Sequence, residues 1–275
     1  MNKMKILRVN ADDFGLTRGV TDGILKSHLN GILTHTSIMS NGLDFIRAIQ
    51  IAKDNPTLGI GIHLNLTWGK PLNNLKSDNT LVDKSGDFFC LSKFIRLYLI
   101  GSISKKQVEA EWNAQIIKFL DSGIKITHLD SHHHIHMLPG LNKIIKKCAD
   151  RFSIKLIRNS TEAFSVQESD ISSNIKKLIF LFLSKLNGHS QNNNYFKGLF
   201  LHGKKDFKNL LKLLIRNLEY GVTELMVHPG IPDAQLSLQD TYVEERLIEL
   251  EALCDKNIIS LIEKENILLM GNEFG

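Results

Sequence analysis

Four short segments of this sequence collect the side chains that hydrolytic metal sites use. Seven of the eleven histidines lie within them, although the chain has 275 residues. Burying ionisable groups without partners is costly, so a purely structural protein has little reason to gather them in this way. The segments are residues 10–15 (NADDFG), 61–66 (GIHLNL), 128–136 (HLDSHHHIH) and 226–230 (MVHPG). The sequence therefore predicts an enzyme.

The paired aspartates of the first segment, Asp12 and Asp13, can divide two tasks between them. One carboxylate can bind a cation while its neighbour stays free as a base, because the charge of the cation keeps both ionised at neutral pH. The alternative is structural, since aspartates before a helix stabilise its positive N-terminal end. In the second segment, His63 lies among small residues that leave room for a ligand, although a lone histidine in a strand is more often a buried structural residue.

The histidine-rich segment 128–136 is harder to explain by structure alone. If it is extended, the two-residue period of a strand places one set of side chains on the same side. That set is His128, Asp130, His132, His134 and His136. One ion cannot bind them all, so some of these side chains must orient ligands or contact substrate. The alternative is an incidental histidine-rich loop.

Two imidazoles and one carboxylate leave coordination positions open on a metal ion. Such an ion can activate a water molecule and polarise a carbonyl group. The same ligand set also describes a non-haem iron(II) oxygenase, although the sequence lacks the all-β strand pattern of a cupin. Separately, His228 precedes Pro229 near the end of a predicted strand, and its imidazole is suited to act as a general acid.

Strands and helices alternate along the chain, which predicts an α/β fold with mostly parallel strands. We expect strands at residues 5–10, 59–66, 125–130, 155–158, 199–202, 224–228 and 267–270, and helices at residues 17–30, 43–53, 104–122, 141–151, 206–220 and 244–256. Residues 71–89 are expected to form a long loop over the mouth of the site. Each motif lies at or just after the carboxyl end of a predicted strand, where functional loops converge in barrels and open α/β sheets.

The bulk properties predict one domain spanning residues 1–275. Cys90, Cys148 and Cys254 lack the spacing of a disulfide framework or a zinc site, which fits a reducing compartment. The N-terminus has no signal-peptide core, and the longest apolar run, residues 178–183, is far shorter than the roughly 20 residues that span a bilayer. We therefore expect a cytoplasmic protein. The motifs give no support to a nucleic-acid partner.

Positive charge is concentrated in one stretch of the chain. Residues 174–216 hold eight lysines and one arginine against a single acidic residue, and they include the apolar run 178–183. One explanation is a helix that buries its apolar face and exposes its lysines. The other is contact with an anionic membrane surface or with a phosphorylated substrate.

In this order, the four segments resemble the signature of the YdjC-like carbohydrate deacetylases, a family that includes the chitooligosaccharide deacetylases. The resemblance is clearest over residues 5–158 and returns around His228. It implies a (β/α) barrel-like glycoside hydrolase/deacetylase fold. It also implies removal of an acetyl group from an N-acetylated amino sugar, with release of acetate. Residues 159–197 match no family pattern, so we expect a variable, substrate-selecting insertion there.

The resemblance further implies a role for each matching residue. Asp13, His63 and His132 would bind one divalent metal ion. Asp12 would be the base that deprotonates the attacking water. His228 would be the acid that protonates the leaving amine.

Two more residues are expected near the substrate. Arg158 matches a family arginine and would hold Asp12 or the substrate, and His136 would contact the substrate. The family is described with magnesium or zinc, and the imidazole ligands favour zinc or a similar transition metal. A chitooligosaccharide, a nucleotide sugar and a lipid-linked amino sugar at a membrane surface all remain open as substrates. A homodimer and a non-catalytic sugar-binding protein on the same fold also remain open.

Overall fold

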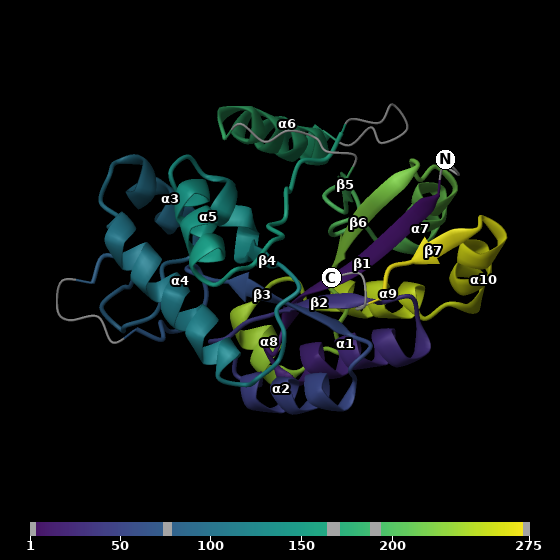
Figure 1. The fold of residues 1–275 in the computed structure, drawn as a ribbon, viewed down its shortest axis with the longest axis horizontal. Helices are drawn as coiled ribbons and strands as arrows, with labels where there is room; N and C mark the ends of the chain where they lie inside the picture. The colour runs from purple at the N-terminus through teal and green to yellow at the C-terminus, as the bar shows by residue number, and fades with distance from the viewer. Residues whose placement is uncertain (1–3, 74–78, 164–170, 188–193, 272–275) are drawn as a thin grey trace.

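The chain folds around one parallel sheet with helices packed against it (Figure 1). The computed structural model describes residues 4–73, 79–163, 171–187 and 194–271. The sheet has seven strands: β1 Lys5–Phe14, β2 His35–Ile38, β3 Gly59–Leu64, β4 Leu129–Ser131, β5 Asn194–Lys197, β6 Gly221–Val227 and β7 Ile267–Leu269. Their order is β4-β3-β2-β1-β6-β5, with β7 paired to β1, and each pair of these strands is parallel. The predicted α/β fold with mostly parallel, barrel-like strands is confirmed, as a curled sheet that stays open between β4 and β5.

Strand β1 holds this sheet together because it pairs with three others. It runs beside β6 from Lys5 to Ala11, pairs with β7 at its amino end, and pairs with β2 at its carboxyl end. From Leu7 onward each residue of β1 is buried, as is usual for a parallel strand covered on both faces. The strand continues to Phe14, beyond the predicted end at residue 10. The two aspartates therefore belong to the strand itself.

The helices surround the sheet on several sides. They are α1 Arg18–Asn30, α2 Phe45–Asp54, α3 Leu91–Leu99, α4 Lys105–Leu120, α5 Leu141–Arg151, α6 Ile171–Leu186, α7 Phe207–Arg216, α8 Ala234–Gln239, α9 Glu244–Leu253 and α10 Lys256–Lys264, with a 3₁₀ helix η1 at His132–Met137. Figure 1 shows α1 and α2 along one edge of the molecule and α3, α4 and α5 grouped near β4. Helix α6 stands apart from these groups, on the side opposite α1 and α2.

Where a local capping signal exists, the predicted helix ends are confirmed. Helix α1 begins after Thr17, whose hydroxyl accepts a hydrogen bond from the backbone N–H of Val20. Gly31 follows the last residue of α1, as predicted. Helix α5 also has the predicted bounds.

Two predicted strands are wrong, and one predicted helix is shorter than expected. Residues 199–202 form a turn, and the strand that pairs with β6 is β5, just before them. The helix predicted at 244–256 is confirmed but ends at Leu253, and Asp255, whose side chain accepts a hydrogen bond from the backbone N–H of Asn257, precedes a new helix. The predicted strand at 155–158 contributes only an isolated bridge. A short apolar run in the sequence does not distinguish a buried turn from a strand.

Two bulk features concern the membrane and the cysteines. Across the described ranges, no helix combines the length and the apolar character that crossing a bilayer requires. The three cysteines are free thiols, of which Cys148 is buried and Cys90 exposed.

The packing of Gly61 in β3 yields a prediction about stability. The space beside Gly61 is filled by the ring of His128, since a Cβ atom at Gly61 would lie 2.3 Å from His128 Cε1. That ring is buried, and its Nε2 lies 3.0 Å from Ser37 Oγ. Gly61→Ala should lower the free energy of unfolding by about 1–3 kcal/mol, the usual cost of overpacking a core. Urea unfolding measures this, and an unchanged midpoint would contradict the packing described.

Candidate metal centre and its cavity

The end of β1 is distorted so that both aspartates face the same cavity. In a regular strand, neighbouring side chains point to opposite faces. Here the β1–β2 pairing is irregular between Ala11 and Phe14, and Asp13 has a left-handed backbone with φ 70°. Such bulges are known to redirect side chains beside functional sites. As a result Asp12 and Asp13 both line the cavity described below.

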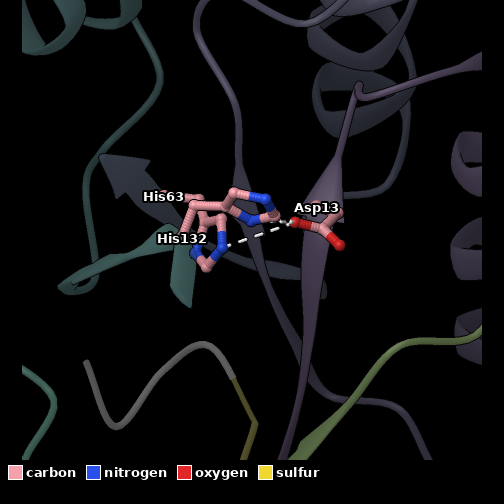
Figure 2. Close-up of side chains that lie close together, drawn as sticks. All are labelled: Asp13, His63 and His132. Carbon is pink, nitrogen blue, oxygen red and sulfur yellow. Dashed lines mark ion pairs between the residues drawn. The ribbon is translucent and has the colours of Figure 1, made fainter. Parts of the chain in front are cut away.

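Asp13, His63 and His132 come together around one point (Figure 2). Their candidate ligand atoms all lie within 4.8 Å of one another. Asp13 Oδ1 is 3.0 Å from His132 Nδ1 and 3.4 Å from His63 Nε2. The residues come from β1, β3 and η1, which are far apart in the sequence. The structure thus brings together the three predicted metal ligands.

The environment of these atoms suits a cation. Asp13 Oδ1 and His63 Nε2 are both buried, and His63 Nε2 makes no hydrogen bond to the described protein. Buried polar atoms usually have hydrogen-bond partners, so a ring nitrogen that lacks one and faces a carboxylate oxygen at 3.4 Å indicates a position for a ligand. One carboxylate and two imidazoles are donors that zinc and similar transition metals prefer. The residues present therefore fit a divalent metal ion.

His63 is oriented by a second carboxylate. Its Nδ1 donates a hydrogen bond to Asp130 Oδ1 at 2.7 Å, which leaves Nε2 free to face Asp13. Asp130 in turn accepts a hydrogen bond from Ser37 Oγ at 2.6 Å. Burial alone would lower the pKa of His63, but the surrounding carboxylates, Asp130 first, raise it to about 9. The negative potential that attracts this proton would equally attract a cation.

Asp12 is fixed by Arg158. The guanidinium donates two hydrogen bonds to the Asp12 carboxylate, at 2.6 and 2.7 Å. Its Nη2 lies 2.8 Å from Asp130 Oδ2, and its Nε donates to Glu224 Oε1 at 2.6 Å. Burial would raise the pKa of Asp12, but Arg158 holds it well below the usual range. Asp12 is therefore ionised and held in one orientation beside the candidate metal position.

The structure does not support direct substrate contact by Arg158 or His136. Arg158 is 1% exposed, its guanidinium is bound by carboxylates, and it does not belong to the cavity lining. His136 is also buried away from the lining, where its ring nitrogens contact Ser131 Oγ at 2.7 Å and the Arg158 carbonyl at 3.0 Å. Of the two roles predicted for Arg158, holding Asp12 is the one that its contacts allow.

Asp13 is held from its other side by Arg246, a residue that the sequence did not single out. Arg246 Nη2 donates to Asp13 Oδ2 at 2.7 Å, and it also lies 3.0 Å from Asp240 Oδ2. Burial would raise the pKa of Asp13, but Arg246 and His132 keep it well below the usual range. Because Oδ2 is occupied, Oδ1 is the oxygen that remains for a cation.

The histidine-rich segment is not extended, so the predicted alternation is wrong. Residues 132–137 form η1, and both His133 and His134 have left-handed backbones, with φ 56° and 53°. His133 Nδ1 lies 2.9 Å from Thr67 Oγ1, and His134 Nδ1 lies 2.8 Å from Ser160 Oγ. Because of this tight turn, the three successive imidazole rings point in different directions. Among them, His132 is the ring that faces Asp13.

His228 lies at the cavity wall, directly after β6. Its backbone N–H donates to Glu249 Oε2 at 2.5 Å, and the Tyr242 hydroxyl donates to the other oxygen of Glu249. The ring of His228 makes edge contacts with the rings of Tyr242 and His202. Burial lowers the pKa of His228 to about 4, although two nearby aspartates oppose the shift. The imidazole is therefore neutral at pH 7 in the free protein.

These residues line a cavity of about 440 Å³, within the usual range for small-molecule sites. Its polar lining includes Asp12, Asp13, His63, His132 and His228. Its apolar lining includes side chains from α3 and α6. The expected loop at residues 71–89 is confirmed as a loop over its described residues, 71–73 and 79–89, but none of these lines the cavity. The Leu72 and Asn73 N–H groups donate to buried Glu111 on α4. Helix α6 lies at the cavity instead.

Comparison with known proteins identifies the family. The family model described as YdjC-like protein matches residues 6–264. The chain belongs to the YdjC-like family. A protein of Oceanobacillus iheyensis named Carbohydrate deacetylase is 34% identical over 259 residues, which cover 94% of this chain and 99% of that protein. Another of the same name, from Thermoanaerobacter pseudethanolicus, is 34% identical over 266 residues and 97% of each chain.

A solved structure shares the fold of this YdjC-like protein. It is described as a candidate cellobiose-phosphate cleavage protein of Enterococcus faecalis, and it superimposes with a TM-score of 0.79 at 29% sequence identity over 98% of each chain. The predicted family is thereby confirmed.

Three residues that shape this YdjC-like site lie in segments without a recognised motif: Arg246, Tyr242 and His202. Asp130 belongs to the histidine-rich motif, and its contact with His63 is the ligand-orienting role expected of some members of that motif. Arg246 carries no sequence signal, since it is one of several charged residues on an ordinary helix.

The ligand geometry makes a prediction about metal binding. His132→Ala should leave the purified protein with well below one metal ion per chain, because one of three ligands is gone. His133→Ala is the matched control, since it removes the neighbouring imidazole, which contacts Thr67. Metal analysis after dialysis compares the two. Equal metal content in both variants would show that His132 is not a ligand.

The contact between Arg246 and Asp13 makes a second prediction. Arg246→Gln should weaken metal affinity by roughly 10–100-fold, the usual effect of losing a group that orients a ligand. Arg47→Gln provides a control, because Arg47 forms partly exposed ion pairs with Asp22 and Asp44. Competition with a chromophoric chelator measures the affinity. If the Arg246→Gln protein binds metal as tightly as the parent, Arg246 does not orient Asp13 for metal binding.

Proposed function

We propose that this YdjC-like protein is a metal-dependent hydrolase that removes the acetyl group from an N-acetylated amino sugar and releases acetate. The observation that carries the proposal is the meeting of Asp13, His63 and His132 around one point, with ionised Asp12 beside it in a cavity. The names of the relatives support sugar deacetylation as the reaction. The contacts in the cavity then suggest what each side chain does.

The metal ion would be held by Asp13 Oδ1, His63 and His132. When bound, a divalent ion supplies Lewis-acid chemistry: it polarises the acetyl carbonyl and makes water more acidic. Two further residues orient the ligands of this ion. Asp130 keeps His63 Nε2 directed at the site, and Arg246 leaves one oxygen of Asp13 free.

Asp12 acts as the general base. It is ionised because of Arg158, and its carboxylate cannot turn away, since the guanidinium holds both oxygens. A base must lie within hydrogen-bond reach of the proton that it removes, and the place of Asp12 in the cavity wall supports this role. Asp12 takes a proton from the attacking water.

His228 acts as the general acid. Because its pKa is lowered to about 4, the imidazole starts the cycle neutral and must gain a proton before it can give one. The proton that Asp12 removes from water is the available source. Transfer from Asp12 to His228, and then to the leaving nitrogen as the C–N bond breaks, moves one proton from water to the amine and keeps the protons balanced.

Other functions receive less support. The ligand set also suits a non-haem iron(II) oxygenase, but the relatives bear the name of a deacetylase. A non-catalytic sugar-binding protein would not need an oriented, ionised aspartate beside a metal site. A cytoplasmic location, a homodimer and the substrate-selecting role of residues 159–197 stay predictions.

An acetate-release screen tests the proposed reaction. Chitooligosaccharides, nucleotide sugars and lipid-linked amino sugars would be incubated with the protein, with and without chelator, and without oxygen. We expect acetate from at least one class, loss of activity with chelator, and recovery when zinc or magnesium is returned. Activity that requires oxygen would favour the oxygenase, and silence across the panel would favour a binding protein.

The role of Asp12 makes a further prediction. Asp12→Asn should keep the metal, yet lose roughly 10²–10⁴-fold in turnover, the usual contribution of a general base. Asp83→Asn, which changes an exposed carboxylate, is the control. Metal analysis and thermal melting would accompany the assay to show that the site and fold persist. Full activity in Asp12→Asn would exclude Asp12 as the base.

A further inference from the structure

The apolar side of the cavity is unusual for a protein that binds only a sugar. Leu91 and Ile95 of α3 and Ile179, Phe180 and Leu183 of α6 line it. Sugar hydroxyl groups need hydrogen-bond partners when they leave water, and these side chains offer none. Hydrocarbon, in contrast, gains free energy when it is transferred to such a surface. The cavity can therefore accept a ligand that has a polar reacting group and an apolar part.

Helix α6 also exposes an apolar stripe to the outside. Ile175, Leu178, Ile179, Phe182 and Leu186 are each between 52% and 62% exposed. Their spacing is that of one face of a helix. Exposed apolar residues that form a contiguous patch usually mark a surface that contacts a partner or a membrane.

The helix is nevertheless anchored to the rest of the protein by its other face. Lys177 is buried and lies 3.2 Å from Glu162 Oε1, and the ring of Phe180 contacts that of His134. After the helix, the Asn187 side chain donates to the Met137 carbonyl at 2.8 Å. The inward face of α6 thus combines the buried Lys177 and Leu183, while the apolar stripe is turned outward. The apolar side chains of this helix are therefore only partly buried, in contrast to the first explanation of this stretch.

The stripe and the cavity form one continuous surface. Ile179 belongs to both, because it is 52% exposed and also lines the cavity. The two helices that carry its apolar side chains bring only positive charge, because neither α3 nor α6 contains an acidic residue. Lys93 and Arg96 on α3, and Lys185 on α6, are exposed. Basic side chains beside exposed apolar ones are the pattern of helices that lie on anionic membranes.

We propose that the substrate is an amphiphile, an N-acetylated amino sugar attached to a hydrocarbon chain, which this protein meets at an anionic membrane surface through α6 and α3. The inference rests on the proposed function and specifies its substrate class. This substrate explains both the apolar cavity lining and the exposed stripe of α6. The hydrocarbon chain of the substrate occupies the cavity, while the stripe contacts the bilayer. A second copy of the protein would cover the stripe but would leave the cavity lining unexplained.

Vesicle binding tests the membrane contact. The full-length protein would be sedimented with vesicles of phosphatidylcholine mixed with phosphatidylglycerol, and with vesicles of phosphatidylcholine alone. Leu178→Gln with Phe182→Gln should weaken binding to the mixed vesicles by about 10-fold or more, because apolar area inserted in the bilayer is lost. Ile46→Gln with Leu238→Gln is the matched control, because these side chains are 78% and 85% exposed on α2 and α8.

A pair of substrates tests the apolar half of the cavity. The methyl and dodecyl glycosides of N-acetylglucosamine carry the same acetamido group and differ only in hydrocarbon. The parent protein should favour the dodecyl glycoside in kcat/KM by roughly 10-fold or more, since each buried methylene adds to binding. Equal values for the two glycosides would overturn the proposal.

Other outcomes are equally decisive. The absence of binding to mixed vesicles, or binding that the α6 variant retains, would overturn the membrane contact. A parent that is a dimer in light scattering, with an α6 variant that is a monomer, would assign the stripe to a second copy instead. If vesicle binding depends on α6 but neither glycoside releases acetate, the membrane contact stands and the proposed reaction on this sugar fails.

Discussion

Four carboxylates and three guanidinium groups are buried together beneath the cavity, and the site depends on their near balance. They are Asp12, Asp13, Asp130, Glu224, Arg8, Arg158 and Arg246. Removing one partner of such a buried pair typically costs about 3–5 kcal/mol, because the other charge is left uncompensated. The excess of one negative charge raises the pKa of His63, which lies beside Asp13, to about 9. A bound cation would take the place of the proton on His63, so the same charges that stabilise the site also prepare it for metal.

This arrangement divides two adjacent aspartates into different roles. The bulge in β1 turns both toward the cavity, and each then meets its own arginine. Arg158 donates hydrogen bonds to both oxygens of Asp12, which keeps this carboxylate ionised and in one orientation. Arg246 holds only one oxygen of Asp13, which leaves the other for the cation. The division follows from hydrogen-bond geometry and needs no difference between the two side chains.

The sequence predicted the parts of the site that local patterns encode. Asp12, Asp13, His63 and His132 were found because each lies at the end of a strand in a short motif, and parallel strands bring their carboxyl ends together. The path of residues 132–137 was not predicted, because a left-handed backbone at two histidines depends on their tertiary contacts. Arg246 was missed for a similar reason, since its partner is more than two hundred residues away. A helix was considered for the region of α6, but which of its faces points outward could not be known before its neighbours were placed.

The central claim is that Asp13, His63 and His132 bind one divalent ion, and anomalous X-ray diffraction tests it most directly. A crystal grown with zinc, with data collected on both sides of the zinc absorption edge, locates the ion independently of the model of the protein. We expect one anomalous peak at about 2.0–2.3 Å from Asp13 Oδ1 and from one nitrogen of each histidine, the usual lengths of zinc bonds. A peak bound elsewhere, or no peak at this position in a zinc-saturated crystal, would contradict the account.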